Sequence, residues 1–163
     1  MDVLKVNSWQ NISGSTMQAP LKFEYYDIPY TTASVATTGY ISSLSGYTTS
    51  NTTAMWGFNY SPVSSSSYIM WMLTTDIDRD TNGYQEHLCV FVDNVCYSSS
   101  FLYPRSSGNE PCLHHQSGTY TNSNTSTKSI YIRGARGNGG TMYLGKAMNN
   151  AQARTMLIWE YPQ

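Results

Sequence analysis

Two strongly apolar runs, separated by an acidic segment, dominate the middle of the chain. The runs are Tyr68–Leu73 and Leu88–Cys96. Four of the ten acidic residues lie between them, within eleven positions: Asp76, Asp78, Asp80 and Glu86. Short apolar runs bounded by polar residues are typical of buried strands. We therefore expect two buried strands, with the acidic segment as the turn that joins them.

Turn-forming residues divide the rest of the chain into further short strands. We expect these strands at Lys5–Trp9, Leu21–Ile28, Ser34–Leu44, Thr53–Tyr60, Lys128–Arg133, Thr141–Leu144 and Thr155–Tyr161. Within the second apolar run, Asp93 and Asn94 both tolerate positive φ and predict a two-residue hairpin turn. Ser34–Leu44 has a weakly apolar side, which indicates an edge strand. Thr155–Tyr161 is almost continuously apolar, which indicates a central strand.

Helical periodicity is nearly absent, apart from one or two possible turns at Lys146–Ala153. We expect Ser98–Ser126 to be the longest irregular region, because prolines, glycines and a run of Ser, Thr and Asn interrupt it. The pattern predicts an all-β fold, an antiparallel β-sandwich or jelly roll of about nine short strands. The length of 163 residues suits a single domain over residues 1–163.

Charge is scarce and tyrosine is abundant. Charged residues make up 12% of the chain against a usual share of about 25%, and the formal net charge is −1. Such a surface has no electrostatic attraction for nucleic acid or an anionic membrane. Fourteen tyrosines accompany many Ser, Thr and Asn residues, a composition typical of recognition surfaces. No apolar run approaches the ~20 residues of a membrane span, and Met1–Gln10 has no signal-peptide pattern.

The acidic segment contains half of a calcium-binding pattern. Asp78-Arg79-Asp80-Thr81-Asn82-Gly83 resembles the first half of an EF-hand loop, in which oxygen ligands alternate and a glycine permits the bend. The candidate Ca²⁺ ligands are Asp76, Asp78, Asp80 and Asn82. The twelfth loop position holds Cys89 where the pattern has a glutamate, so a solvated polar turn is the alternative.

Three cysteines and three histidines offer a second possible metal set. They are His87, Cys89, Cys96, Cys112, His114 and His115, and their spacing fits no standard pair of zinc-binding knuckles. The odd number of cysteines also argues against a simple disulfide framework. We interpret the cysteines mainly as reduced, partly buried thiols.

Candidate ligand-binding residues lie in the long irregular region and around the glycine-rich turn Gly134–Gly140. They are Arg105, His114, His115, Tyr120, Arg133 and Arg136. Arginine side chains at a hairpin tip suit a carboxylate or sulfate group on a ligand. No G-x-S-x-G motif is present, and no spacing of acids singles out a glycosidase pair. We therefore expect a binding protein and not an enzyme.

The chain as a whole resembles the receptor-binding heads of trimeric viral and phage fibres. The resemblance lies in its many short strands, scarce charge, abundant Ser, Thr, Asn and Tyr, long polar loops, lack of a visible leader and apolar final strand TMLIWEY. It implies a homotrimer on the virion surface or in the extracellular space that binds a host-surface glycan or protein receptor. The segment LCVFVDNVCY is also similar to paired strands of concanavalin-like jelly rolls.

The alternative function is a lectin-like jelly-roll module or a glycoside hydrolase that acts on polysaccharide. A sandwich with so few surface charges needs its apolar flanks buried in a defined assembly. The sequence places the expected subunit interface on the strands Ser34–Leu44 and Thr53–Tyr60.

Overall fold

The computed structural model describes residues 9–10, 16–17, 19–37, 41, 43–79, 85–102, 112–137, 140–145 and 154–163. Within these ranges the chain is almost entirely β-structure. The strands are β1 Trp9–Gln10, β2 Thr16–Met17, β3 Lys22–Asp27, β4 Thr31–Thr37, β5 Thr53–Tyr60, β6 Ser67–Arg79, β7 Glu86–Val92, β8 Val95–Leu102, β9 Cys112–Asn122, β10 Lys128–Arg136, β11 Gly140–Leu144 and β12 Thr155–Pro162. The single 3-10 turn among these residues is η1, Leu44–Gly46. None of the described helical segments is long and apolar enough to span a membrane.

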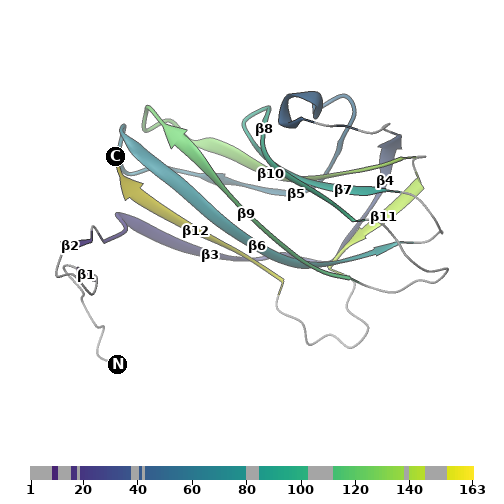
Figure 1. Cartoon of the computed structure of the whole chain (residues 1–163), viewed down its shortest axis with the longest axis horizontal. Helices are drawn as coiled ribbons and strands as arrows, with labels where there is room; N and C mark the ends of the chain where they lie inside the picture. The colour runs from purple at the N-terminus through teal and green to yellow at the C-terminus, as the bar shows by residue number, and fades with distance from the viewer. Residues whose placement is uncertain are drawn as a thin grey trace.

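Two sheets form the sandwich, and Figure 1 shows them as lower and upper layers. Sheet I has the order β3-β12-β6-β9, and sheet II has the order β5-β10-β7-β8. On the same side of β6, β12 pairs with its first part and β11 pairs with its last residues. Strand β4 pairs with β11 and also with β10. All pairs are antiparallel except the short β4–β10 contact. The predicted all-β sandwich is confirmed.

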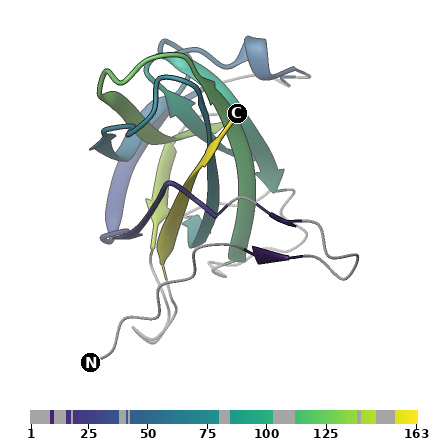
Figure 2. The same ribbon diagram turned by 90° about the vertical axis from the view of Figure 1, so that its left-hand side faces the viewer.

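The core lies between the two sheets, and the end-on view of Figure 2 shows strands of both sheets around this common interior. On β6 the strand alternation turns Ile69, Trp71 and Leu73 inward. The indole Nε1 of Trp71 donates a hydrogen bond to Ser98 Oγ at 3.2 Å. A Cβ at Gly118 of β9 would lie 2.4 Å from the Trp71 ring, so the indole fits only because that position is glycine.

Several predicted strands have the expected positions. Strand β5 has the predicted bounds Thr53–Tyr60, and β12 is central, between β3 and β6. The hairpin between β7 and β8 turns at Asp93-Asn94, with Asp93 at a φ of 53°. Local turn chemistry and strong periodicity therefore predicted these elements correctly.

The acidic segment does not begin as a turn. Strand β6 continues to Arg79 because Thr75, Asp76 and Ile77 pair with β9. The two apolar runs also lie in different sheets, β6 in sheet I and β7 in sheet II. The two strands therefore do not pair with each other as a hairpin.

Two other expectations were wrong. The strand expected at Ser34–Leu44 is β4, Thr31–Thr37, and it is not an edge strand, since it pairs with β11 on one side and with β10 on the other. The region expected to be irregular, Ser98–Ser126, holds the end of β8 and all of β9. The predicted strand Lys5–Trp9 and helical turns at Lys146–Ala153 lie outside the described residues, apart from Trp9 in β1.

Candidate functional site

An exposed tyrosine occupies the middle of the outer face of sheet II. Strand β10 alternates, so that Ile130 and Ile132 enter the core while Tyr131 faces outward with 37% of its surface exposed. Its neighbour on β5 is Gly57. A Cβ at Gly57 would lie 2.3 Å from Cδ1 of Tyr131, so the ring rests directly on the backbone of β5. The absence of a side chain at Gly57 thus determines where the Tyr131 ring lies.

Polar side chains adjoin this ring. Ser129 Oγ donates a hydrogen bond to Asn59 Oδ1 at 3.3 Å, and Ser129 N donates to Asp93 Oδ1 at 3.0 Å. Asn59 and Asp93 are exposed. Together with Arg133, these residues form what we call the Tyr131 surface: Asn59, Asp93, Ser129, Tyr131 and Arg133. It combines an aromatic platform with amide, hydroxyl, carboxylate and guanidinium groups.

Arg133 attaches the segment before β5 to sheet II. Its Nε donates to Thr52 Oγ1 at 2.8 Å, and its Nη2 donates to the carbonyl oxygens of Thr52 at 2.7 Å and Thr49 at 3.0 Å. The guanidinium also lies 5.4 Å from the ring centroid of Phe91. Burial lowers the pKa of Arg133 from its ordinary value. These contacts hold the arginine in place beside Tyr131.

The same segment covers another part of sheet II, and Figure 1 shows η1 on the outer side of this layer. Tyr47 packs with Cys89, Phe91 and Cys96 in a small buried cluster. Its hydroxyl lies 2.7 Å from Nδ1 of His87. Burial lowers the pKa of this histidine. The outward side chains of β7 are therefore part of a second, smaller core.

Cys89 and Cys96 are free and buried. The hydrogen bond with Cys96 and then burial raise the pKa of Cys89, while the same hydrogen bond lowers the pKa of Cys96. Both thiols belong to the cluster under Tyr47. The side chain of Cys112 lies outside the described residues.

The structure separates the other predicted ligand-binding residues. Arg136 is fully buried, with Nε 3.4 Å from Oε1 of Glu86. Strand β10 extends to this residue, so the expected presentation of Arg136 at a hairpin tip was wrong. Burying a guanidinium requires a partner, and Glu86 on the neighbouring strand supplies it. Arg105 lies outside the described residues.

The three candidates on β9 point in two directions. His114 is buried, with Nε2 2.7 Å from Ser100 Oγ, and burial lowers its pKa. Tyr120 also faces inward and makes an edge contact with Tyr97 at a centroid distance of 5.1 Å. His115 is exposed on the outer face of sheet I, with Nδ1 3.1 Å from Thr74 Oγ1. Ligand binding by these residues stays a prediction, and Arg133 alone among the candidates belongs to the Tyr131 surface.

Among the four candidate Ca²⁺ ligands, the structure describes the side chain of Asp76 alone. This side chain is 1% exposed, and its Oδ1 lies 3.4 Å from Nε of Arg154. Asp78 is in β6, with its side chain outside the described residues, and Asp80 and Asn82 lie outside them entirely. In the described parts of the chain, no group of three His, Cys, Asp or Glu side chains is placed to hold a metal ion. The calcium site therefore stays a prediction.

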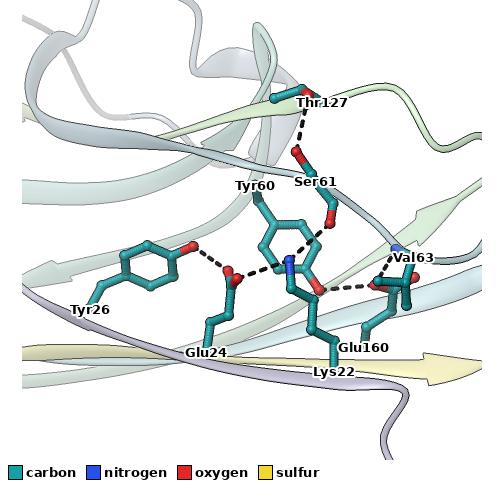
Figure 3. A network of polar contacts seen from close by, with 8 residues as sticks. All are labelled: Lys22, Glu24, Tyr26, Tyr60, Ser61, Val63, Thr127 and Glu160. Carbon is teal, nitrogen blue, oxygen red and sulfur yellow. Dashed lines mark hydrogen bonds and ion pairs between the residues drawn. The ribbon is translucent and has the colours of Figure 1, made fainter.

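A buried carboxylate lies at the other end of the sandwich, and Figure 3 shows its surroundings. Glu160 of β12 is fully buried and accepts hydrogen bonds from Tyr60 Oη at 3.0 Å, Val63 N at 2.9 Å, Ser64 N at 2.9 Å and Ser67 Oγ at 2.8 Å. Burial acts to raise the pKa of Glu160. The hydrogen bonds outweigh burial and hold this pKa below its ordinary value.

Charged and aromatic groups of β3 continue this network (Figure 3). Lys22 Nζ pairs with Glu24 at 2.9 Å, donates to the carbonyl oxygen of Ser61 at 3.0 Å and lies 4.5 Å from the ring centroid of Tyr60. Tyr26 donates its hydroxyl hydrogen to Glu24. Because Glu160 has no exposed surface and its oxygens are engaged, this network ties β12 to β5 and the segment after it. Glu160 itself therefore does not offer its carboxylate to a substrate.

Sequence reasoning missed Tyr131 and Asn59. The segment Lys128–Arg133 was recognised as a strand, and its alternation was the available signal, since Ser129, Tyr131 and Arg133 must share one face. What could not be read from the sequence is that Gly57, about seventy positions away, lies under the ring.

The known proteins that match this chain are solved structures. No family model and no curated protein matches the sequence. Among solved structures, this chain is similar to a chain in the structure of the infectious bursal disease virus Gx strain. The TM-score is 0.43 and the identity is 8%, over 100% of this chain and 42% of that chain. It is also similar to the VP2 subviral particle of infectious bursal disease virus, with a TM-score of 0.43 and 9% identity over 99% and 42%. The chain spans less than half of both, and similarity at this level carries no argument about function.

Proposed function

We propose that this chain is a receptor-binding head of a viral or phage fibre, and that the Tyr131 surface contacts a glycan on the host. The observation that carries the proposal is an exposed aromatic ring fixed against a glycine and adjoined by polar groups. A pyranose ring has an apolar face that packs on an aromatic ring, and its hydroxyl groups need hydrogen-bond partners. Asn59, Asp93 and Ser129 supply such partners on adjacent positions.

The surface is also preorganised. Gly57 sets the ring position of Tyr131, Thr49 and Thr52 hold Arg133, and the Asp93 turn holds Ser129. Binding to groups that are already ordered avoids the entropy cost of fixing them, so a small site gains affinity. The low charge of the chain suits a neutral glycan better than a sulfated or phosphorylated one.

The fibre-head assignment rests on the composition and the sandwich fold. Location at the virion surface and attachment to a host cell follow from that assignment and belong to the same proposal. The alternative, a glycoside hydrolase on this scaffold, requires two accessible carboxylates on either side of a scissile bond. A hydrolase would also release new reducing ends from the glycans that it binds.

The experiment is a glycan array probed with the wild-type chain, Tyr131→Ala and a control, Tyr30→Ala. Tyr30 is a second exposed tyrosine, outside the Tyr131 surface. We expect Tyr131→Ala to weaken binding to the best glycan by roughly tenfold, the limit of ~1.5 kcal/mol for an aromatic contact, and Tyr30→Ala to leave it unchanged. Equal binding by all three proteins, or none by the wild type, would refute the assigned site. Release of new reducing ends from the bound glycans would instead favour the hydrolase.

A further inference from the structure

The outer face of sheet I carries apolar side chains in three successive rows. Strand pairing places Tyr68 beside Tyr161, then Met70 beside Trp159 and Phe23, then Met72 beside Leu157 and Tyr25. We call this set the apolar face: Phe23, Tyr25, Tyr68, Met70, Met72, Leu157, Trp159 and Tyr161. On β9 the same rows end in Thr121, Thr119 and Ser117. These three rows contain no charged side chain.

The exposure of the apolar face is large for a surface that meets only water. Phe23 and Tyr25 are 53% and 54% exposed, and Tyr68, Met70 and Met72 are 41–43% exposed. Since an aromatic side chain carries ~150–250 Å², the three exposed aromatics alone present on the order of 300 Å². The largest apolar patch of a typical monomer is about 300–600 Å² and is often functional. With the two methionines and the half-buried residues of β12, the face approaches the ~800 Å² that each partner contributes to a stable complex.

We propose that a second copy of this chain covers the apolar face, so that the protein is a homo-oligomer joined through sheet I. The centre of a protein interface is enriched in aromatic residues and methionine and depleted of charge, and its rim is polar. The apolar face has this arrangement. Its centre is aromatic and methionine-rich, and hydroxyl side chains of β9 lie along one side.

The next row of residues on the outer face of sheet I forms another part of the rim around the apolar face. This row contains titratable side chains. Asp27, Thr155, Thr74 and His115 follow one another across the four strands. A lipid surface would favour basic residues around such a patch, and this row supplies only an acid and a histidine. Another sheet suits a sheet face, since two sheets pack face to face about 10 Å apart. Every copy carries the same face, so self-association needs no other gene product.

This interface differs from the one that the sequence predicts. Both edges of β4 are occupied by β10 and β11. On β5, Trp56 and Phe58 pack against Tyr26 inside the same chain. These strands therefore have less apolar surface to offer than the apolar face. We expect the assembly to be the trimer implied by the resemblance to fibre heads, but the proposal concerns the face that is buried.

Light scattering at about 10 micromolar protein tests this proposal on the wild-type chain, the double variant Met70→Lys/Met72→Lys and the control Val95→Lys. Val95 is an exposed apolar residue of sheet II, so its substitution adds a lysine to an apolar position on the other sheet. We expect the wild type and the control to have a multiple of the 18.2 kDa chain mass, and the double variant to have the mass of one chain. Circular dichroism should show the same strand content in all three, since both methionine side chains point away from the core.

A wild type that is monomeric at this concentration would overturn the proposal, and so would a folded double variant that keeps the oligomeric mass. The outcome is separable from receptor binding, because Tyr131 lies on the opposite sheet. A monomeric double variant should keep its single-site affinity for a soluble glycan and lose only the 10²–10⁴-fold gain that multivalent display gives on an array. Wild-type monomers that bind neutral vesicles would identify a lipid surface as the occupant and would also reject the proposal.

Discussion

Strands β6 and β7 are both apolar runs in the sequence, yet the outward side chains of β7 are buried and those of β6 are exposed. On β7 the outward residues Cys89 and Phe91 are fully buried, because Tyr47 lies over them. On β6 the outward residues Met70 and Met72 are exposed, and no described segment covers them. An apolar run thus identifies a strand with two apolar faces, but it does not say whether the same chain or another molecule covers the second face.

The comparison also separates the two proposed roles. The segment that contains Tyr47 covers part of the outer face of sheet II. The surface that stays exposed around Tyr131 is small, polar and preorganised, which suits a small ligand. Sheet I leaves a broad, uncharged and apolar surface, which suits a protein partner. We therefore propose different roles for the two sheets, assembly for sheet I and recognition for sheet II.

The largest expected effect contrasts two outward positions directly. Phe91→Ala should destabilise the chain by about 3–5 kcal/mol, since it removes a fully buried ring from the cluster under Tyr47. Met72→Ala, measured on protein diluted to the monomer, should cost less than about 0.5 kcal/mol, because surface substitutions rarely cost more. Urea unfolding monitored by tryptophan fluorescence measures both. Similar costs at the two positions would mean that the outer faces do not differ.

Glu160→Gln tests the link between the sheets and should have the next largest effect, about 1–3 kcal/mol at neutral pH. The amide cannot accept all four hydrogen bonds that the carboxylate accepts, and a buried donor is left unpaired. Because the pKa of Glu160 is lowered in the folded chain, its contribution is present above the unfolded-state pKa and is lost as the pH falls through the folded-state pKa. Denaturant melts should therefore show the wild-type advantage at pH 7 and a steadily smaller one as the pH falls below the ordinary pKa of a glutamate. An advantage that is independent of pH would contradict this role.

Tyr47→Phe tests how Tyr47 covers the outer face of sheet II. It should lower the free energy of unfolding by a smaller amount, about 1 kcal/mol. It keeps the packing over Cys89 and Phe91 and removes the hydroxyl that lies 2.7 Å from His87 Nδ1. Thermal unfolding with Tyr47→Ala as the larger truncation separates the hydrogen bond from the ring. If Tyr47→Phe were as damaging as Tyr47→Ala, the hydroxyl and not the ring would hold the cover in place.

The fold was largely predictable where local signals and burial agree. The Asp93-Asn94 turn and the strands β5 and β12 are examples, because turn chemistry and strand periodicity are local properties. Strand β9 was missed because its inward side chains are polar, His114 and Gln116 among them. Their partners, Ser98 and Ser100, come from a strand that the sequence does not place nearby.

The candidate sites were less predictable, because each depends on a contact between distant strands. Arg136 is buried because Glu86 lies beside it, and Asp76 is buried because Arg154 lies within ion-pair distance. The Tyr131 platform depends on Gly57. The exposure of Met70 and Met72 likewise depends on which segments cover sheet I. None of these pairings has a signature within a single stretch of sequence.

Methionine oxidation tests the difference between the two outer faces most directly. Met70 and Met72 are exposed in the single chain, whereas Met142 and Met156 are fully buried. Peroxide converts accessible thioethers to sulfoxides, and mass spectrometry of peptides measures the rate at each methionine. At concentrations that favour the oligomer, Met70 and Met72 should oxidise nearly as slowly as Met142 and Met156, and dilution to the monomer should accelerate them alone. Fast oxidation of Met70 and Met72 at every concentration would contradict burial of the apolar face by a second copy.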